Sequence, residues 1–243
     1  MEEQLKYETI PNFDPNQTIK DIYSDDLNKQ TYGLYSLTYN SGDYNLILTT
    51  LEKFIRDERW ETRYTVFQCL SRFLELYRNI PIDNFLPYLI EGFDDKNNRV
   101  KGNVTDCLEN FFYYITPTWT FKIGDINKTL ISGQTIDVIK VLLFIHHKSW
   151  TGKKLSSIIR KCLKHKNAIV QYCGGILLRF AYNNLHSQLS EFETVTKLAH
   201  KLDTSELSYF NNEVYVMVEW IEEDMNKLKT KLQSNKYVKK SSH

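Results

Sequence analysis

The residue types that carry out catalysis or bind metals do not form a catalytic motif in this sequence. It contains no G-x-x-x-x-G-K-[ST] loop to hold phosphates, no H-E-x-x-H pair to bind zinc and no G-x-S-x-G turn to present a nucleophile. His146 and His147 are adjacent, so on a helix they point to different sides and cannot easily share one metal ion. We therefore expect no catalytic residue, no metal site and no cofactor, in a protein that is not an enzyme.

The four cysteines, Cys69, Cys107, Cys162 and Cys173, do not form any C-x-x-C pair. Each lies within an apolar helical pattern, where a free Cys behaves as a small hydrophobic residue. The N-terminal residues include no apolar signal region, and the longest apolar run, VLLFI at 141–145, is too short to span a bilayer. We therefore expect core thiols in a reducing cytoplasm and no membrane segment.

The charged residues that suit binding are concentrated in one region. Residues 138–190 contain nine Lys and Arg and no Asp or Glu, although the formal net charge of the chain is only +1. A surface with this composition attracts an acidic protein surface or the phosphates of a nucleic acid. We expect its cations to steer an acidic partner and its Trp to anchor that partner. The candidate partner-binding residues are Lys148, Trp150, Lys153, Lys154, Arg160, Lys161 and Lys164.

Two stretches of the chain carry the same residues at the same offsets, 38 positions apart. Residues 57–73 are DERWETRYTVFQCLSRF, and residues 95–111 are DKNNRVKGNVTDCLENF. The shared apolar residues recur at intervals of three and one, which places them on one face of an α-helix. We therefore predict two equivalent helices with matching buried positions. These positions are Val66, Cys69, Leu70, Phe73, Val104, Cys107, Leu108 and Phe111.

A charged pair accompanies the apolar residues in each copy, Asp57 with Arg63 and Asp95 with Lys101. Each Asp precedes its helix, where a carboxylate caps or charge-stabilises the helix N-terminus. We expect all four residues to be structural, with Arg63 near Asp57 and Lys101 near Asp95.

The residues between the two copies predict a second amphipathic helix over 81–93, so that the repeating unit is a helical hairpin. Weaker copies occur at 28–37, 134–144 and 167–180, and the last of them contains Gly174 and Gly175, which permit close helix packing. A period near 38 residues is typical of stacked helical hairpins. The predicted fold is an all-α, right-handed α-solenoid of five or six antiparallel hairpins.

We expect this solenoid to form a single domain over residues 1–233. The remaining residues, 234–243, include three of the six lysines that follow residue 225 and predict a flexible basic tail.

The hairpin resembles the HEAT repeat, in the Asp before the helix, the following Arg or Lys and the aliphatic stripe. The resemblance covers roughly residues 20–220 and is strongest over 43–116. It implies that the Asp and the basic residue form a ladder between neighbouring hairpins. The chain is also similar in size and repeat pattern to small bacterial HEAT-like proteins that neutralise a cognate toxin.

Three functions follow from these features. The first is a protein-binding module, and specifically an immunity protein, because a helical array exposes an extended surface for other macromolecules. The second is a DNA glycosylase for alkylated bases, because HEAT-like glycosylases are similar in length and use Trp, Asp and Arg on a basic face. The third is a scaffold subunit of a larger complex. Nucleic acid is the less favoured partner because the chain is nearly neutral.

Overall fold

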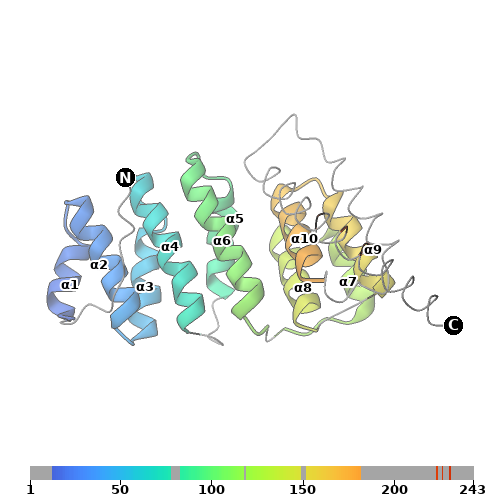
Figure 1. Cartoon of the computed structure of the whole chain (residues 1–243), viewed down its shortest axis with the longest axis horizontal. Helices are drawn as coiled ribbons and strands as arrows, with labels where there is room; N and C mark the ends of the chain where they lie inside the picture. The colour runs from blue at the N-terminus through green and yellow to red at the C-terminus, as the bar shows by residue number, and fades with distance from the viewer. Residues whose placement is uncertain are drawn as a thin grey trace. The chain divides into compact units, whose positions relative to one another are not determined.

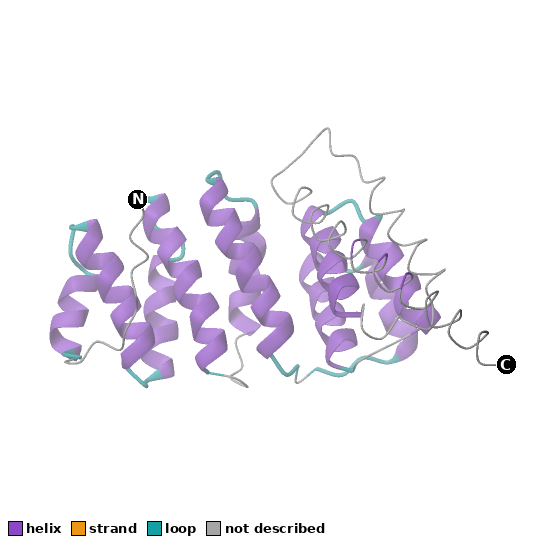
Figure 2. Ribbon diagram, in the orientation of Figure 1, coloured by secondary structure: helices purple, strands orange, loops and turns teal. Residues whose placement is uncertain are grey.

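The computed structural model describes residues 13–77, 83–117, 119–148 and 152–181, with residues 223, 226 and 230. All regular structure in these ranges is helical, as Figure 1 and Figure 2 show. The chain divides into two compact units, Met1–Thr116 and Pro117–His243, at the loop that follows the second strong repeat. The predicted single domain over 1–233 stays a prediction, and the predicted tail at 234–243 lies outside the described residues.

The described residues of unit 1 form three helical hairpins, in each of which a shorter first helix is followed by a longer second helix. The first helices are α1 (Pro15–Ile22), α3 (Tyr44–Phe54) and α5 (Leu86–Phe93), and a short 3-10 turn, η1 (Asp83–Phe85), precedes α5. The second helices are α2 (Leu27–Asn40), α4 (Trp60–Leu76) and α6 (Asn98–Tyr114).

The hairpins of unit 1 stack through their second helices, because α4 packs against both α2 and α6 (Figure 1). Each first helix packs on the second helix of its own hairpin. The eight predicted core positions on α4 and α6 are all buried, with at most 1% of each residue exposed. The prediction of equivalent helices with matching core faces is therefore confirmed.

Unit 2 contains two further hairpins of the same kind. Its helices are α7 (Ile123–Ser132), α8 (Thr135–His147), α9 (Gly152–Leu163) and α10 (Ala168–Ala181). The second helices, α8 and α10, pack against each other, and so do the first helices, α7 and α9. The described residues thus form five hairpins of an all-α helical-repeat solenoid, as the sequence predicts.

Short polar side chains start several of these helices. Asp14 Oδ1 accepts hydrogen bonds from the N–H groups of Asn16 at 2.9 Å and Gln17 at 3.2 Å, and Pro15 occupies the first turn of α1. Asp26 and Asp43 cap α2 and α3 in the same way. The repeat pattern did not predict α1, although Asp14–Pro15 is a recognised helix-start signal.

Glycine allows two hairpins to pack closely. Gly33 occupies the position in α2 that Val66 occupies in α4, and an added Cβ would lie 2.8 Å from the backbone nitrogen of Ile22 on α1. Gly174 likewise allows close packing of α9 and α10, because an added Cβ there would lie 2.6 Å from Cβ of Cys162. The close packing expected at Gly174 is therefore present.

We predict that Gly33→Ala lowers the thermal unfolding temperature. Besides Cγ1 of Ile22, an added Cβ would meet two backbone atoms that cannot rotate away, the nitrogen of Ile22 at 2.8 Å and the oxygen of Thr18 at 3.1 Å. Overpacking of this kind costs roughly 1–3 kcal/mol, more than the ~1 kcal/mol that Ala contributes through helix propensity. Gly124→Ala on α7 is the control, because a Cβ there meets nothing within 4 Å. Thermal melts followed by circular dichroism should show a lower unfolding temperature only for Gly33→Ala. An equal decrease in both variants would contradict the packing argument.

Candidate protein-binding surfaces

A network of polar contacts, here called the loop ladder, joins the hairpins of unit 1 at the end where their first and second helices connect. Its side chains are those of Gln30, Asp57, Arg59, Arg63 and Asp95. Arg63 donates to both carboxylate oxygens of Asp95, from Nε at 2.7 Å and from Nη2 at 3.0 Å. Its Nη1 donates to the backbone oxygen of Asp57 at 2.7 Å. Arg63 therefore ties the second hairpin to the third.

The first hairpin joins the loop ladder through Gln30, which is buried. Gln30 Nε2 donates to the backbone oxygen of Ile22 at 3.3 Å, and its Oε1 accepts from Arg59 Nη2 at 2.9 Å. Thr62 Oγ1 donates to the same Oε1 at 2.7 Å. Arg63 lies beside Asp57, as the sequence predicts, but it bonds the backbone oxygen of Asp57. Its carboxylate partner is Asp95, 32 residues further along the chain in the next hairpin.

The electrostatic environment of Asp95 follows from these contacts. Burial alone would raise the pKa of Asp95, but the Arg63 guanidinium, the N–H of Asn97 and the charge of Lys101 together hold that pKa below its ordinary value. The Asp95 side chain is only 8% exposed and that of Arg63 is 18% exposed. The ion pair is thus shielded from solvent, unlike most surface pairs.

One turn position recurs three residues before the second helix of four hairpins. Its side chain accepts the N–H two residues further on: Ser24 from Asp26 at 3.2 Å, Asp57 from Arg59 at 2.9 Å, and Asp95 from Asn97 at 2.8 Å. In unit 2, His165 Nδ1 accepts from the N–H of Asn167 at 3.1 Å. Asp57 and Asp95 therefore stabilise the turn, and they are not the N-cap residues of α4 and α6, which are Arg59 and Asn97.

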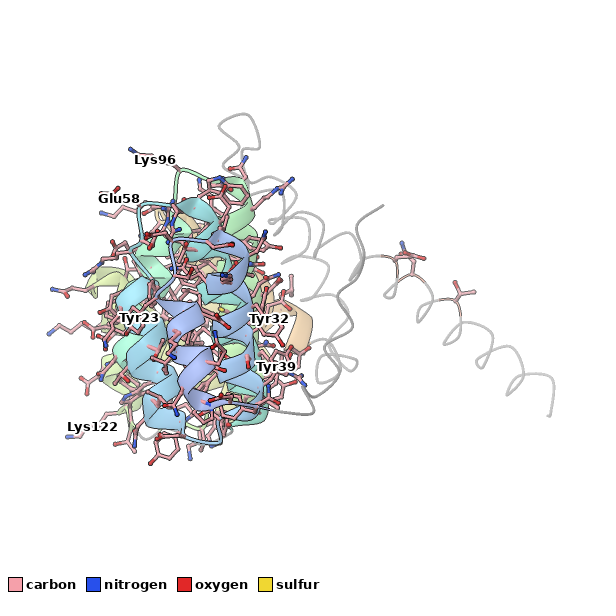
Figure 3. All side chains as sticks on the ribbon, turned by 90° about the vertical axis from the view of Figure 1, so that its left-hand side faces the viewer. Tyr23, Tyr32, Tyr39, Glu58, Lys96 and Lys122 are labelled. Carbon is pink, nitrogen blue, oxygen red and sulfur yellow. The ribbon has the colours of Figure 1, made fainter. Side chains whose placement is uncertain are left out.

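The exposed side of α2, α4 and α6 is rich in tyrosine. Tyr32 on α2 is 53% exposed and Tyr113 on α6 is 50% exposed. Figure 3 shows Tyr32 and Tyr39 on one side of unit 1, with Tyr23 on the opposite side and Glu58 and Lys96 at the loop end. Tyr, Trp and Arg are the residues that contribute most binding energy in protein interfaces, so this side is a candidate docking surface.

A hollow of about 340 Å³, here called the α4 hollow, opens on this tyrosine-rich side. Its lining residues come from α2, α4 and α6. They are Tyr35, Tyr39, Gln68, Ser71, Arg72, Glu75, Asn103 and Asp106.

Arg72 is one of the residues that line the α4 hollow. Its guanidinium carbon is 5.2 Å from the ring centroid of Tyr39, and its Nη1 donates to Glu75. Its Nε is buried and has no hydrogen-bond acceptor among the described residues. A buried unsatisfied donor costs stability, and such groups in native structures need an explanation.

Amide side chains connect the helices around the α4 hollow. Asn103 Nδ2 donates to the backbone oxygen of Tyr64 at 2.9 Å, and Asn110 Nδ2 donates to Ser71 Oγ at 2.7 Å. Tyr35 donates its hydroxyl hydrogen to Gln68. Since these bonds run from each helix to the next, the wall of the hollow is held in place before any partner arrives.

The second candidate surface is the outer side of α9 in unit 2. Leu155, Ile158, Ile159, Cys162 and Leu163 form its buried side. The outer side carries exposed cations at helical spacing, and Lys161 Nζ donates to Asn127 Oδ1 of α7 at 2.9 Å. The exposed cations are Lys154, Arg160 and Lys161 on the helix and Lys164 and Lys166 in the turn that follows it.

The other predicted partner-binding residues lie apart from this set or outside the described structure. Lys148 is exposed at the end of α8, with its ammonium 5.9 Å from the ring centroid of Phe144. Lys153 lies in α9, but its side chain is not among those described, and Trp150 lies outside the described residues. The role of Trp150 as an anchor therefore stays a prediction.

Burial shifts the pKa values of the cysteines and of His146. All four cysteines are buried, and burial raises the pKa of the Cys69 and Cys162 thiols to about 12. Burial lowers the pKa of His146, and the adjacent His147 lowers it further. No cluster of three or more metal-binding side chains occurs among the described residues, and none of the helices described is long and apolar enough to cross a membrane.

Sequence reasoning did not find the α4 hollow. Its residues are spaced along three helices as ordinary outward-facing polar positions, and no motif distinguishes them. The available signal was the alignment of the repeat, which places Tyr39, Arg72 and Asn110 at one position of successive second helices. Comparing such positions across hairpins, in addition to the core positions, would have indicated a shared surface.

No protein-family model matches the sequence, and no curated protein matches it. Among solved structures, an engineered protein is 14% identical with a TM-score of 0.38, over 86% of this chain and 96% of that chain. A designed armadillo repeat protein is 13% identical with a TM-score of 0.40, over 86% and 100% of the two chains. A computationally designed armadillo repeat protein for modular peptide recognition is 12% identical with a TM-score of 0.39, over 85% and 99%.

We predict that Arg63→Met destabilises the protein by roughly 2–3 kcal/mol, because it removes a charged, bidentate hydrogen bond and leaves the Asp95 carboxylate poorly solvated. Arg56→Met is the matched control, since Arg56 makes a bidentate pair with Glu91 in which the side chains are 64% and 54% exposed. Thermal melts should show a clearly lower unfolding temperature for Arg63→Met and almost no change for Arg56→Met. Equal losses would mean that the loop ladder has no special role.

The Asp95–Arg63 pair also predicts a pH dependence. Because the pKa of Asp95 is lowered in the folded protein, its stabilising effect is fully present above about pH 4 and is lost as the pH falls through the lowered pKa. The difference in unfolding temperature between wild type and Asp95→Asn should therefore be largest near pH 6 and shrink below pH ~4. A constant difference between pH 6 and pH 2.5 would contradict this assignment.

Proposed function

We propose that this chain is a non-enzymatic helical-repeat module that binds a partner protein with an acidic surface. The observation that carries the proposal is the outer side of α9, where Lys154, Arg160 and Lys161 are exposed. Residues 138–190 contain no Asp or Glu, so no carboxylate close in sequence offsets the positive charge of these side chains. The carboxylates described between residues 119 and 181 are Asp125 and Asp137, on α7 and α8.

The exposed cations of α9 are better suited to attracting an acidic partner than to catalysis. Charges of one sign on one helix face raise the rate of association with a surface of opposite charge. The buried side of α9 is apolar, so α10 and α7 hold the helix in place while its cations remain in solvent. Binding strength then depends on apolar and aromatic contacts beside the cations, a part that we assign to Trp150.

The more specific proposal is that the chain is an immunity protein, which neutralises a cognate toxin in the cytoplasm by forming a stoichiometric complex. Its support is the repeat pattern over residues 43–116, which resembles that of small bacterial HEAT-like immunity proteins. Because the exposed side of α9 is cationic, it requires an acidic patch on its partner. We therefore expect the complex to form at an acidic surface of the toxin.

The test compares wild type with a Lys154→Glu, Lys161→Glu, Lys164→Glu variant in which only exposed side chains change. A protein encoded beside this gene is purified, and complex formation is followed by size-exclusion chromatography with light scattering and by stopped-flow kinetics. We expect a complex of defined stoichiometry whose association rate falls at least tenfold in the variant. We also expect the association rate of the variant to depend less on salt.

The immunity role is tested directly by the growth of cells that express the protein encoded beside this gene. Wild type should restore growth, and the α9 variant should restore it less. Release of alkylated bases from duplex DNA, with tight and salt-sensitive DNA binding, would instead establish the glycosylase alternative. A variant that binds the same partner at the wild-type rate would overturn the assignment of α9.

A further inference from the structure

We propose that the α4 hollow in unit 1 is a second docking site, which takes a cationic side chain, Lys or Arg, from a peptide segment of a partner protein. This inference does not depend on α9, because it rests on residues of α2, α4 and α6 alone. The occupant it requires is opposite in charge to the partner surface that α9 requires.

The walls of the hollow combine the two groups that attract organic cations. Tyr35 and Tyr39 supply aromatic rings, and Glu75 and Asp106 supply carboxylates. A cation near a tyrosine ring gains about 0.5–1 kcal/mol at an exposed site, and a carboxylate within a few ångströms adds a charge-assisted hydrogen bond. A volume of about 340 Å³ holds the end of a long side chain while the partner backbone stays outside.

The chain itself shows that these walls hold a cation. The Arg72 guanidinium lies over the Tyr39 ring at 5.2 Å and pairs with Glu75. Arg72 thus contacts Tyr39 and Glu75, and Tyr35 and Asp106 also line the hollow. An incoming Lys or Arg would therefore make the same two kinds of contact that Arg72 makes.

The charge of the surrounding surface favours the same occupant. Glu61, Glu75, Asp106 and Glu109 lie at helical spacing on the side of α4 and α6 that bears the hollow. The guanidinium groups on that side are those of Arg72 and Arg99, and Arg99 lies over the Trp60 ring at 5.6 Å. Four carboxylates and two guanidinium groups leave this side net negative, which attracts a basic segment and repels an acidic one.

The experiment uses the full chain and two labelled peptides of the same length, tetra-arginine and tetra-citrulline, which have similar shapes but differ in charge. Fluorescence anisotropy at 0.15 M salt measures the affinity of each peptide. We expect the arginine peptide to bind at least tenfold more tightly than the citrulline peptide.

Two charge variants separate binding in the hollow from general attraction to an acidic protein. Asp106→Lys changes the hollow, and Asp94→Lys makes the same change in formal charge at an exposed residue of the α5–α6 loop. We expect Asp106→Lys to weaken binding of the arginine peptide at least fivefold and Asp94→Lys to weaken it less than twofold. Circular dichroism confirms that both variants are folded.

A ring variant tests the aromatic wall. Tyr35→Leu keeps an apolar side chain but removes the ring, and we expect a twofold to fivefold loss of affinity for the arginine peptide. The α9 variant with three Glu substitutions should bind this peptide at least as tightly as wild type, which separates this site from α9. Equal effects of Asp106→Lys and Asp94→Lys, equal binding of the two peptides, or no binding of the arginine peptide by wild type would each overturn the proposal.

Discussion

Within each of the two units, a described hairpin leaves an apolar face that its neighbouring hairpin covers, and the rest of the structure depends on that constraint. A pair of short helices cannot bury both of its faces, so stability comes from stacking. The second helices therefore carry large apolar side chains at one repeated set of positions, such as Phe73 on α4 and Phe111 on α6. Where two helices approach too closely for such side chains, glycine replaces them, as Gly33 does beside α1.

Apolar packing alone leaves the register between hairpins loosely defined, because one hydrophobic stripe tolerates small shifts along another. The loop ladder supplies the missing constraint through directional contacts at one end of unit 1. The Arg63–Asp95 pair is specific in distance and angle, since both carboxylate oxygens accept from the same guanidinium. The chemistry varies between hairpins, with Gln30 replacing Arg63 in the first, but the function of linking neighbours is retained.

With the apolar faces covered and the loop ends linked, the outer sides of the helices are available for binding. Two outer surfaces differ in charge and residue type. The outer side of α9 carries cations, and the outer side of α2, α4 and α6 in unit 1 carries tyrosines with an excess of carboxylates. A module with one surface of each kind suits a role in recognition, where different partner surfaces are distinguished by charge. The tyrosines also limit the entropy lost on binding, because they are large and have few rotatable bonds.

The sequence by itself determined the helices and their buried faces, because the 3.6-residue period of a helix is a local property and repeats in every hairpin. It placed Val66, Cys69 and their counterparts in the core, and it identified the cations of α9 as one group. It missed α1, whose eight residues are too few for a clear periodic pattern. Only the tertiary structure decided that Arg63 pairs with Asp95 and that Tyr39, Arg72 and Asp106 surround one hollow. Those contacts join residues about one repeat apart, and their geometry depends on how closely successive helices pack, which local spacing does not specify.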